Sequence, residues 1–159
     1  MPRLVKYIVI GVVILLAQLI IIDWIRIQNI KPDLMMLFIM YLGYREGRIT
    51  GMLMGFGFGL LQDLSTASVF IGLAALSKTV VGFGAGSLKG KFTAVNPVVL
   101  YAVAALILIT GQFIYFGIYY AASSLPTAEL FFRIILPASA YTVVLGSILM
   151  VILPLHFQD

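Results

Sequence analysis

The sequence contains no cysteine among its 159 residues, and only 10% of its residues are charged. Without a thiol, the chain can form neither a disulfide nor a thiolate metal site, and it has no cysteine nucleophile. It has a single histidine, and its serines and threonines show no Ser-His-Asp pattern. The sequence therefore offers no set of residues for catalysis, and we predict a protein that is not an enzyme and has no cofactor.

Apolar residues are abundant instead. They make up 62% of the chain, and the mean hydropathy is +1.13. A soluble domain of ordinary composition does not reach these values. The sequence predicts an all-α integral membrane protein in which residues 1–159 form a single transmembrane domain. The net charge is +4, but the basic residues stand singly or in pairs beside apolar runs, which favours control of topology over nucleic-acid binding.

The apolar runs predict six transmembrane helices. A helix needs about 20 apolar residues to cross the bilayer core. The approximate spans are 5–23, 32–44, 48–63, 69–88, 97–121 and 133–154. The first is read as a retained span because no small-x-small cleavage site follows it. The second and third are short, so a re-entrant hairpin is the alternative. Six spans are favoured because Arg45 and Arg48 would be costly inside a membrane.

Lysine and arginine are distributed unequally between the two predicted sides of the membrane. The side on which the two termini lie has six basic residues: Arg3, Lys6, Arg45, Arg48, Lys89 and Lys91. The opposite side has three: Arg26, Lys31 and Arg133. The side richer in basic residues usually faces the cytoplasm, so both termini are predicted to be cytoplasmic, in the bacterial inner membrane.

Small residues recur at four-residue steps in two of the predicted helices. The first series is Gly51, Gly55 and Gly59, and the second includes Ala74, Lys78, Gly82, Gly86 and Gly90. A four-residue step keeps side chains on nearly one helix face, and faces of small residues let membrane helices approach closely. Glycine is also simply common in membrane helices. The pattern favours close packing, and the partner can lie within the chain or in another protein.

Four polar residues in or beside the spans are further candidates for structural or interaction roles. Lys78 interrupts a span, where an ionisable residue is a functional candidate. Asp63 is the tempting partner, although a direct pair would need an offset helix or a water, and a lysine bonded to carbonyls is as good an interpretation. Asp33 follows Pro32 at a helix start, where it can act as a cap. Gln62 is expected to join helices by hydrogen bonds, as are the other membrane amides, Gln18 and Gln112.

With these residues in view, the chain resembles the family of the bacterial rod shape-determining protein MreD. The matching features are Pro32-Asp33 before an apolar run, the Gly51-x3-Gly55-x3-Gly59-x2-Gln62-Asp63 pattern, and the small-residue stretch from Gly72 to Leu76. Length and six predicted spans also fit, while the last third carries no matching motif.

The resemblance implies a non-catalytic inner-membrane subunit of the cell-elongation machinery that helps to organise peptidoglycan synthesis. Its implied partners are an MreC-like bitopic membrane protein, a RodA-type polymerase, a class B penicillin-binding protein and MreB filaments. It also implies a fold similar to the substrate-binding components of energy-coupling vitamin transporters.

That fold supplies the alternative function, a small-molecule-binding component of such a transporter. Those proteins commonly carry an Ala-x3-Ala pattern on their first helix. The first apolar run here has only Ala17, which favours the scaffold over the transporter component.

Overall fold

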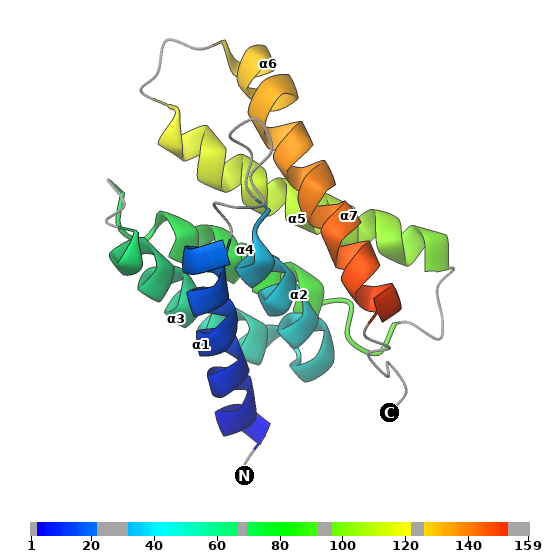
Figure 1. Cartoon of the computed structure of the whole chain (residues 1–159). Coiled ribbons are helices and arrows are strands. Elements are labelled where there is room, and N and C mark those ends of the chain that lie inside the picture. Colours follow the sequence, from blue (N-terminus) through cyan, green and yellow to red (C-terminus); the bar gives the residue numbers. More distant parts are fainter. Residues whose placement is uncertain (1–2, 22–31, 67–69, 92–96, 122–125, 153–159) are drawn as a thin grey trace.

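The computed structural model describes residues 3–21, 32–66, 70–91, 97–121 and 126–152, and these residues form helices and no strands. Because α6, η1 and α7 follow one another directly, they act as one continuous helical body, and the described residues contain six such bodies (Figure 1). The all-helical prediction is confirmed. The elements are α1 (Arg3–Ile21), α2 (Leu34–Glu46), α3 (Arg48–Ser65), α4 (Leu73–Gly86), α5 (Pro97–Tyr119), α6 (Thr127–Leu130), the π-helix η1 (Phe131–Ile135) and α7 (Leu136–Ile152).

The helices differ from the predicted spans mainly at their ends. Helix α4 begins at Leu73, after Gly72 in a left-handed conformation with φ of 98°, whereas the prediction began it at residue 69. Helices α2 and α3 have 13 and 18 residues, which correspond to about 20 and 27 Å. Residue 69, the predicted ends at 23 and 154, and the basic residues Arg26 and Lys31 lie outside the described residues.

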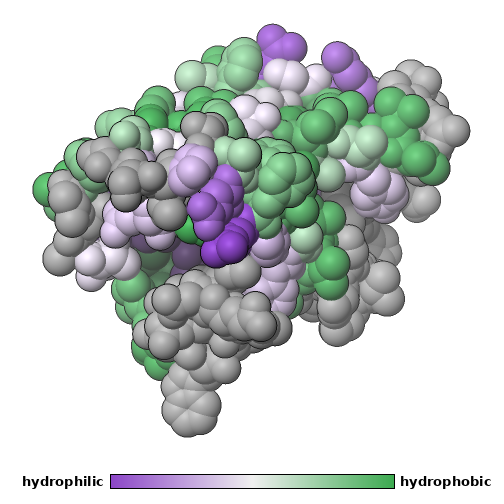
Figure 2. All heavy atoms as spheres, turned by 90° about the horizontal axis from the view of Figure 1, so that it is seen from above, coloured by the Kyte–Doolittle hydropathy of each residue, from purple (hydrophilic) through white to green (hydrophobic). Residues whose placement is uncertain are grey.

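In the part of the chain that the structure describes, two helices are long and apolar enough to cross a membrane, Arg3–Ile20 in α1 and Tyr101–Tyr119 in α5. Their mean hydropathies are 2.1 and 1.8, and only 17% of each window is buried within the protein. Exposed apolar side chains also occupy the outer face of α3, as at Leu53 and Phe56. Apolar residues cover much of the face shown in Figure 2. Such a surface is stable in contact with lipid rather than water.

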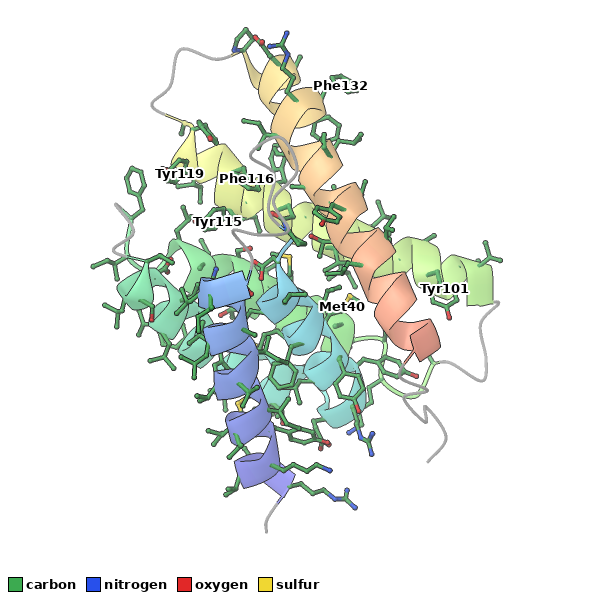
Figure 3. The ribbon with its side chains drawn as sticks, viewed as in Figure 1. Met40, Tyr101, Tyr115, Phe116, Tyr119 and Phe132 are labelled. Carbon is green, nitrogen blue, oxygen red and sulfur yellow. The ribbon has the colours of Figure 1, made fainter. Side chains whose placement is uncertain are left out.

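Aromatic side chains lie toward both ends of α5. Tyr115, Phe116 and Tyr119 are near its C-terminal end and Tyr101 is near its start (Figure 3). The rings of Tyr115 and Tyr119 are stacked, with centroids 6.2 Å apart. Tyrosines concentrate where a membrane helix meets the water interface, and α5 has this arrangement.

Helix α2 lies at the centre of the apolar packing. On one side, a cluster joins it to α1 and α3 through Leu15, Phe38 and Phe58, and the last two rings meet edge to face with centroids 6.1 Å apart. On the other side, Met36 of α2 packs with Val81 of α4 and Leu108 of α5. Its two faces thus connect the first helices of the chain to α5.

The last helical body of the chain, which contains α6, η1 and α7, has a widened turn. The π-helix Phe131–Ile135 comes just before Pro137. A proline lacks the N–H that would bond to the carbonyl four residues earlier, and its ring crowds that carbonyl. A π-helical turn is one way of accommodating such an interruption. The π-helical turn thus lies where Pro137 interrupts the regular hydrogen bonding of the helix.

Candidate functional site

The two small-residue series pack against each other. A β-carbon on Gly51 would lie 2.5 Å from the carbonyl oxygen of Gly82, and one on Gly55 would lie 2.5 Å from that of Lys78. A β-carbon on Gly59 would overlap the backbone of Ala75. Even alanine would therefore force α3 and α4 apart. The question that the sequence left open is answered: the packing partner of these faces lies within the chain.

Gly43 of α2 is a further member of this interface, which the glycine series did not predict. A β-carbon there would lie 2.5 Å from the carbonyl oxygen of Gly82, and the backbones of Gly43 and Gly51 are also in close contact. Three helices therefore meet at glycines. The sequence does contain a sign of this contact, because Gly43 precedes Gly51 by two four-residue steps. Gly43 lies in a different predicted helix, however, so the four-residue register gave no reason to add it to the series.

Lys78 forms an ion pair with Asp33. The Nζ and Oδ2 atoms are 2.7 Å apart, and the two side chains are 1% and 17% exposed. Asp63, the partner considered in the sequence analysis, instead binds backbone N–H groups. Because α4 begins at Leu73, Lys78 lies only about 7.5 Å along the helix axis from its start, and its side chain reaches Asp33 at the start of α2.

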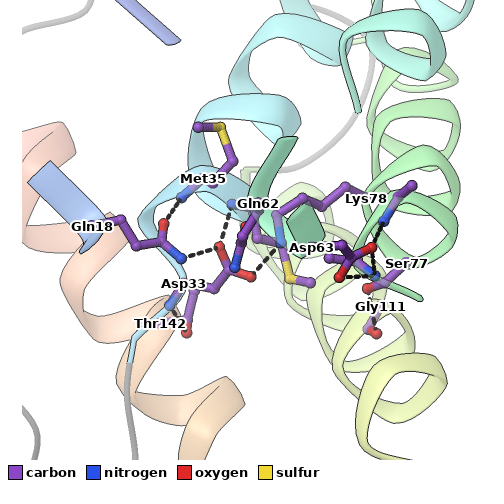
Figure 4. A network of polar contacts seen from close by, with 12 residues as sticks. Gln18, Asp33, Met35, Gln62, Asp63, Ser77, Lys78, Gly111 and Thr142 are labelled. Atoms are coloured by element: carbon purple, nitrogen blue, oxygen red, sulfur yellow. Dashed lines mark hydrogen bonds and ion pairs between the residues drawn. The ribbon is translucent and has the colours of Figure 1, made fainter. Parts of the chain in front are cut away.

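Asp33 is also the cap of α2 and the centre of a polar network (Figure 4). Its Oδ1 accepts a hydrogen bond from the backbone N–H of Met36 at 2.8 Å, as the predicted capping role requires. Gln18 of α1 donates to the same oxygen at 3.4 Å and accepts from the N–H of Met35 at 2.8 Å. The backbone N–H of Asp33 donates to Thr142 of α7 at 3.3 Å. Residues of four helices thus meet at this single aspartate.

Ser77, next to Lys78, extends the network to a fifth helix. Its hydroxyl donates to the carbonyl oxygen of Gly111 in α5 at 2.7 Å, and its side chain is fully buried. Successive residues of α4 therefore contact α2 and α5 through polar groups. In an apolar surrounding, such bonds orient helices more specifically than apolar packing does.

Asp63, at the C-terminal end of α3, caps the following helix. Its Oδ2 accepts from the N–H groups of Gly72 at 2.9 Å and Ala74 at 3.0 Å, and its side chain is 1% exposed. The carboxylate satisfies N–H groups that a helix start leaves without partners, and it faces the positive end of the helix dipole. One residue of α3 therefore holds the start of α4 in place.

The comparisons with known proteins decide the family. The sequence profile described as rod shape-determining protein MreD matches residues 2–159. The chain belongs to the MreD family. No curated protein and no solved structure matches the chain, so the likeness to vitamin-transporter components remains a prediction.

MreD-family proteins are membrane proteins that determine rod shape, and the family is not known for enzymatic activity. Among the residues that the structure describes, no three His, Asp or Glu side chains are grouped as ligands of a metal ion. The carboxylates of Asp33 and Asp63 are both engaged by backbone N–H groups. This arrangement fixes helices relative to one another.

Gln62 differs from its expected role in this MreD-family chain. Its Oε1 is buried and has no hydrogen-bond partner in the described part of the chain, so the predicted hydrogen bond between helices is not made by this oxygen. Gln18, for which the same role was expected, does join α1 to α2 by hydrogen bonds. Pro32 is buried and directly precedes Asp33, the residue that caps the start of α2.

The two ends of this MreD-family bundle carry different charges. At one end, Tyr7 of α1 donates to Glu46 at the end of α2 at 2.7 Å, and Lys89 after α4 lies beside Gly47. The aspartates Asp33 and Asp63 lie at the opposite ends of α2 and α3. The start of α1, the α2–α3 turn and the end of α4, which carry basic residues predicted to share a side, therefore lie close together.

Proposed function

We propose that this chain is a multi-pass inner-membrane subunit of the bacterial cell-elongation complex, where it helps to organise peptidoglycan synthesis without catalysing it. The family match over residues 2–159 is the observation that carries the proposal. The exposed apolar surfaces of α1 and α5 support a place in the membrane. The polar residues of the interior support a structural role, because their contacts join helices of the same chain.

Six transmembrane helices with both termini in the cytoplasm complete the proposed topology. The length of α3, with 18 residues, supports a full span over a re-entrant hairpin, and the short α2 runs back beside it. The basic residues at the α2–α3 turn support placing this turn on the cytoplasmic side.

The proposed direct partner is an MreC-like bitopic membrane protein, with a RodA-type polymerase, a class B penicillin-binding protein and MreB filaments as further members of the complex. The glycine faces of α3 and α4 are occupied by each other, so a partner helix would pack elsewhere. The exposed apolar side chains of the outer helices, such as Leu16 and Leu53, offer the remaining surface within the bilayer.

An affinity purification in mild detergent tests this proposal. A tagged copy of the chain should recover an MreC-like protein together with elongation enzymes, while an unrelated multi-pass protein with the same tag should not. Recovery of the coupling subunit of an ATP-driven transporter with a bound vitamin would overturn the proposal. That outcome would instead support the small-molecule-binding alternative.

A further inference from the structure

Basic side chains without an acidic partner gather at one end of the bundle. Of the described basic residues, Lys78 is paired with Asp33 and Arg133 with Glu129. The others are exposed and form no ion pair with any described acid. Glu46, the acid nearest to them in the chain, accepts a hydrogen bond from Tyr7. This set, called here the basic end, consists of Arg3, Lys6, Arg45, Arg48, Lys89 and Lys91.

Arg48 and Lys89 are brought together at the junction of α3 and α4. A β-carbon on Gly86 would overlap the backbone of Arg48, so the start of α3 touches the end of α4. The Nζ of Lys89 lies 3.8 Å from the point where a β-carbon of Gly47 would stand, directly before Arg48. This backbone contact therefore places the turn after α4, which carries Lys89, beside the start of α3, which carries Arg48.

The surface next to this junction is apolar and open. The Arg48 guanidinium carbon lies 5.5 Å from the ring centroid of Phe83, and that side chain is 46% exposed. On α3, Met52 lies one helical turn after Arg48 on the same face and is 37% exposed. Cationic groups thus stand at the edge of a surface that must face lipid tails in a membrane.

We propose that Arg48 and Lys89 bind the phosphate of an anionic phospholipid, whose acyl chains lie along the exposed apolar side chains of Phe83 and Met52. Arginine binds phosphate through two parallel N–H donors, and lysine adds a second positive charge. An acidic soluble peptide would match the charges but would leave the apolar surface unused. An anionic phospholipid matches both. This binding site goes beyond the proposed role in cell elongation and does not depend on it.

Lipid retention by the full chain tests the site. The protein is reconstituted in nanodiscs of equimolar phosphatidylglycerol and phosphatidylcholine and then extracted in mild detergent. Native mass spectrometry measures which lipid molecules remain bound to it. The wild type should retain phosphatidylglycerol in preference to phosphatidylcholine. The double variant Arg48→Gln/Lys89→Gln should lose this preference by about tenfold, because two phosphate-binding cations are removed.

Two matched variants separate a specific site from general attraction. The charge-conserving Arg48→Lys/Lys89→Arg variant should keep most of the preference. Arg133→Gln removes an exposed charge outside the basic end, and it should change nothing. If the wild type shows no preference, if the double glutamine variant keeps it, or if Arg133→Gln loses as much, the site is overturned. The single variants Arg48→Gln and Lys89→Gln, each expected to lose part of the preference, test the site even if the double variant fails to fold.

Discussion

Lys78 and Asp33 form an ion pair inside the helical bundle, with 2.7 Å between Nζ and Oδ2. The pair ties α4, one turn and a half from its start, to the N-terminus of α2. A lysine that is 1% exposed is stable as a cation only because a carboxylate faces it. Asp33 in turn contacts Gln18 and Thr142, so the pair lies where the most distant parts of the chain meet.

Removing one member of this pair should destabilise the fold. Lys78→Met leaves the Asp33 carboxylate without its cation, and loss of one partner of a buried pair costs about 3–5 kcal/mol. Asp33→Asn added to Lys78→Met should recover part of this loss, since asparagine also caps helices and carries no charge. Thermal unfolding in detergent, followed by helical circular dichroism, measures both effects.

The exposed Glu129–Arg133 pair supplies the control for this prediction. Its arginine side chain is 78% exposed, and an exposed pair contributes about 0–1 kcal/mol. Glu129→Gln should therefore leave the unfolding temperature almost unchanged. A double variant as unstable as Lys78→Met alone would show that the uncompensated charge is not the cause.

Substitutions on the glycine faces should be poorly tolerated. Gly55→Leu and Gly86→Leu place a side chain against the backbone of the facing helix, and such overpacking costs about 1–3 kcal/mol or more. The expected result is loss of folded protein in detergent, measured by size-exclusion chromatography and thermal unfolding.

Two neutral positions on α3 serve as controls. A β-carbon on Gly57 would meet no atom of a facing helix within 4 Å, so Gly57→Ala should be neutral or slightly stabilising. Leu53 is 68% exposed, and Leu53→Val should have little effect. Equal tolerance at Gly55, Gly57 and Leu53 would contradict close packing of α3 on α4.

Asp63 should tolerate asparagine better than leucine. The Asp63 carboxylate accepts from the N–H groups of Gly72 and Ala74, and asparagine keeps one oxygen acceptor while leucine keeps none. Loss of a cap costs about 0.5–2 kcal/mol. In a cell-shape complementation assay, Asp63→Asn should retain partial function and Asp63→Leu should lose more. If both are equally damaging at normal protein levels, the charge itself is essential and ion coupling becomes the better account.

Both termini should face the cytoplasm. The observation behind this prediction is the cluster of basic residues near the start of α1, the α2–α3 turn and the end of α4, since such residues are retained on the cytoplasmic side. Reporter enzymes that are active only in the periplasm, fused at each end, should give no signal. A fusion after Ser65, at the opposite end of α3, should be active. Activity at either terminus would reverse the topology.

Several features follow from the sequence because they depend on neighbouring residues. Apolar runs are long enough for helices whatever their surroundings, and the all-helical fold was predicted correctly. Asp33 caps α2 because a carboxylate directly before a helix start can reach its free N–H groups. The four-residue glycine register identified helix faces made for close approach, since periodicity alone places those residues together. The motif pattern also identified the family.

The sequence did not identify which faces and charges would meet. Gly55 on α3 faces Lys78 on α4, and nothing in either register says that the two series are partners. Gly43 belongs to the same contact from a third helix. Lys78 pairs with Asp33 across 45 positions of the chain, while Asp63 is occupied by the N–H groups at the start of α4. These pairings depend on where α4 begins and on how α2, α3 and α4 cross. Only the tertiary structure sets those positions, because a local sequence pattern determines which residues share a helix face but not which helix packs against that face.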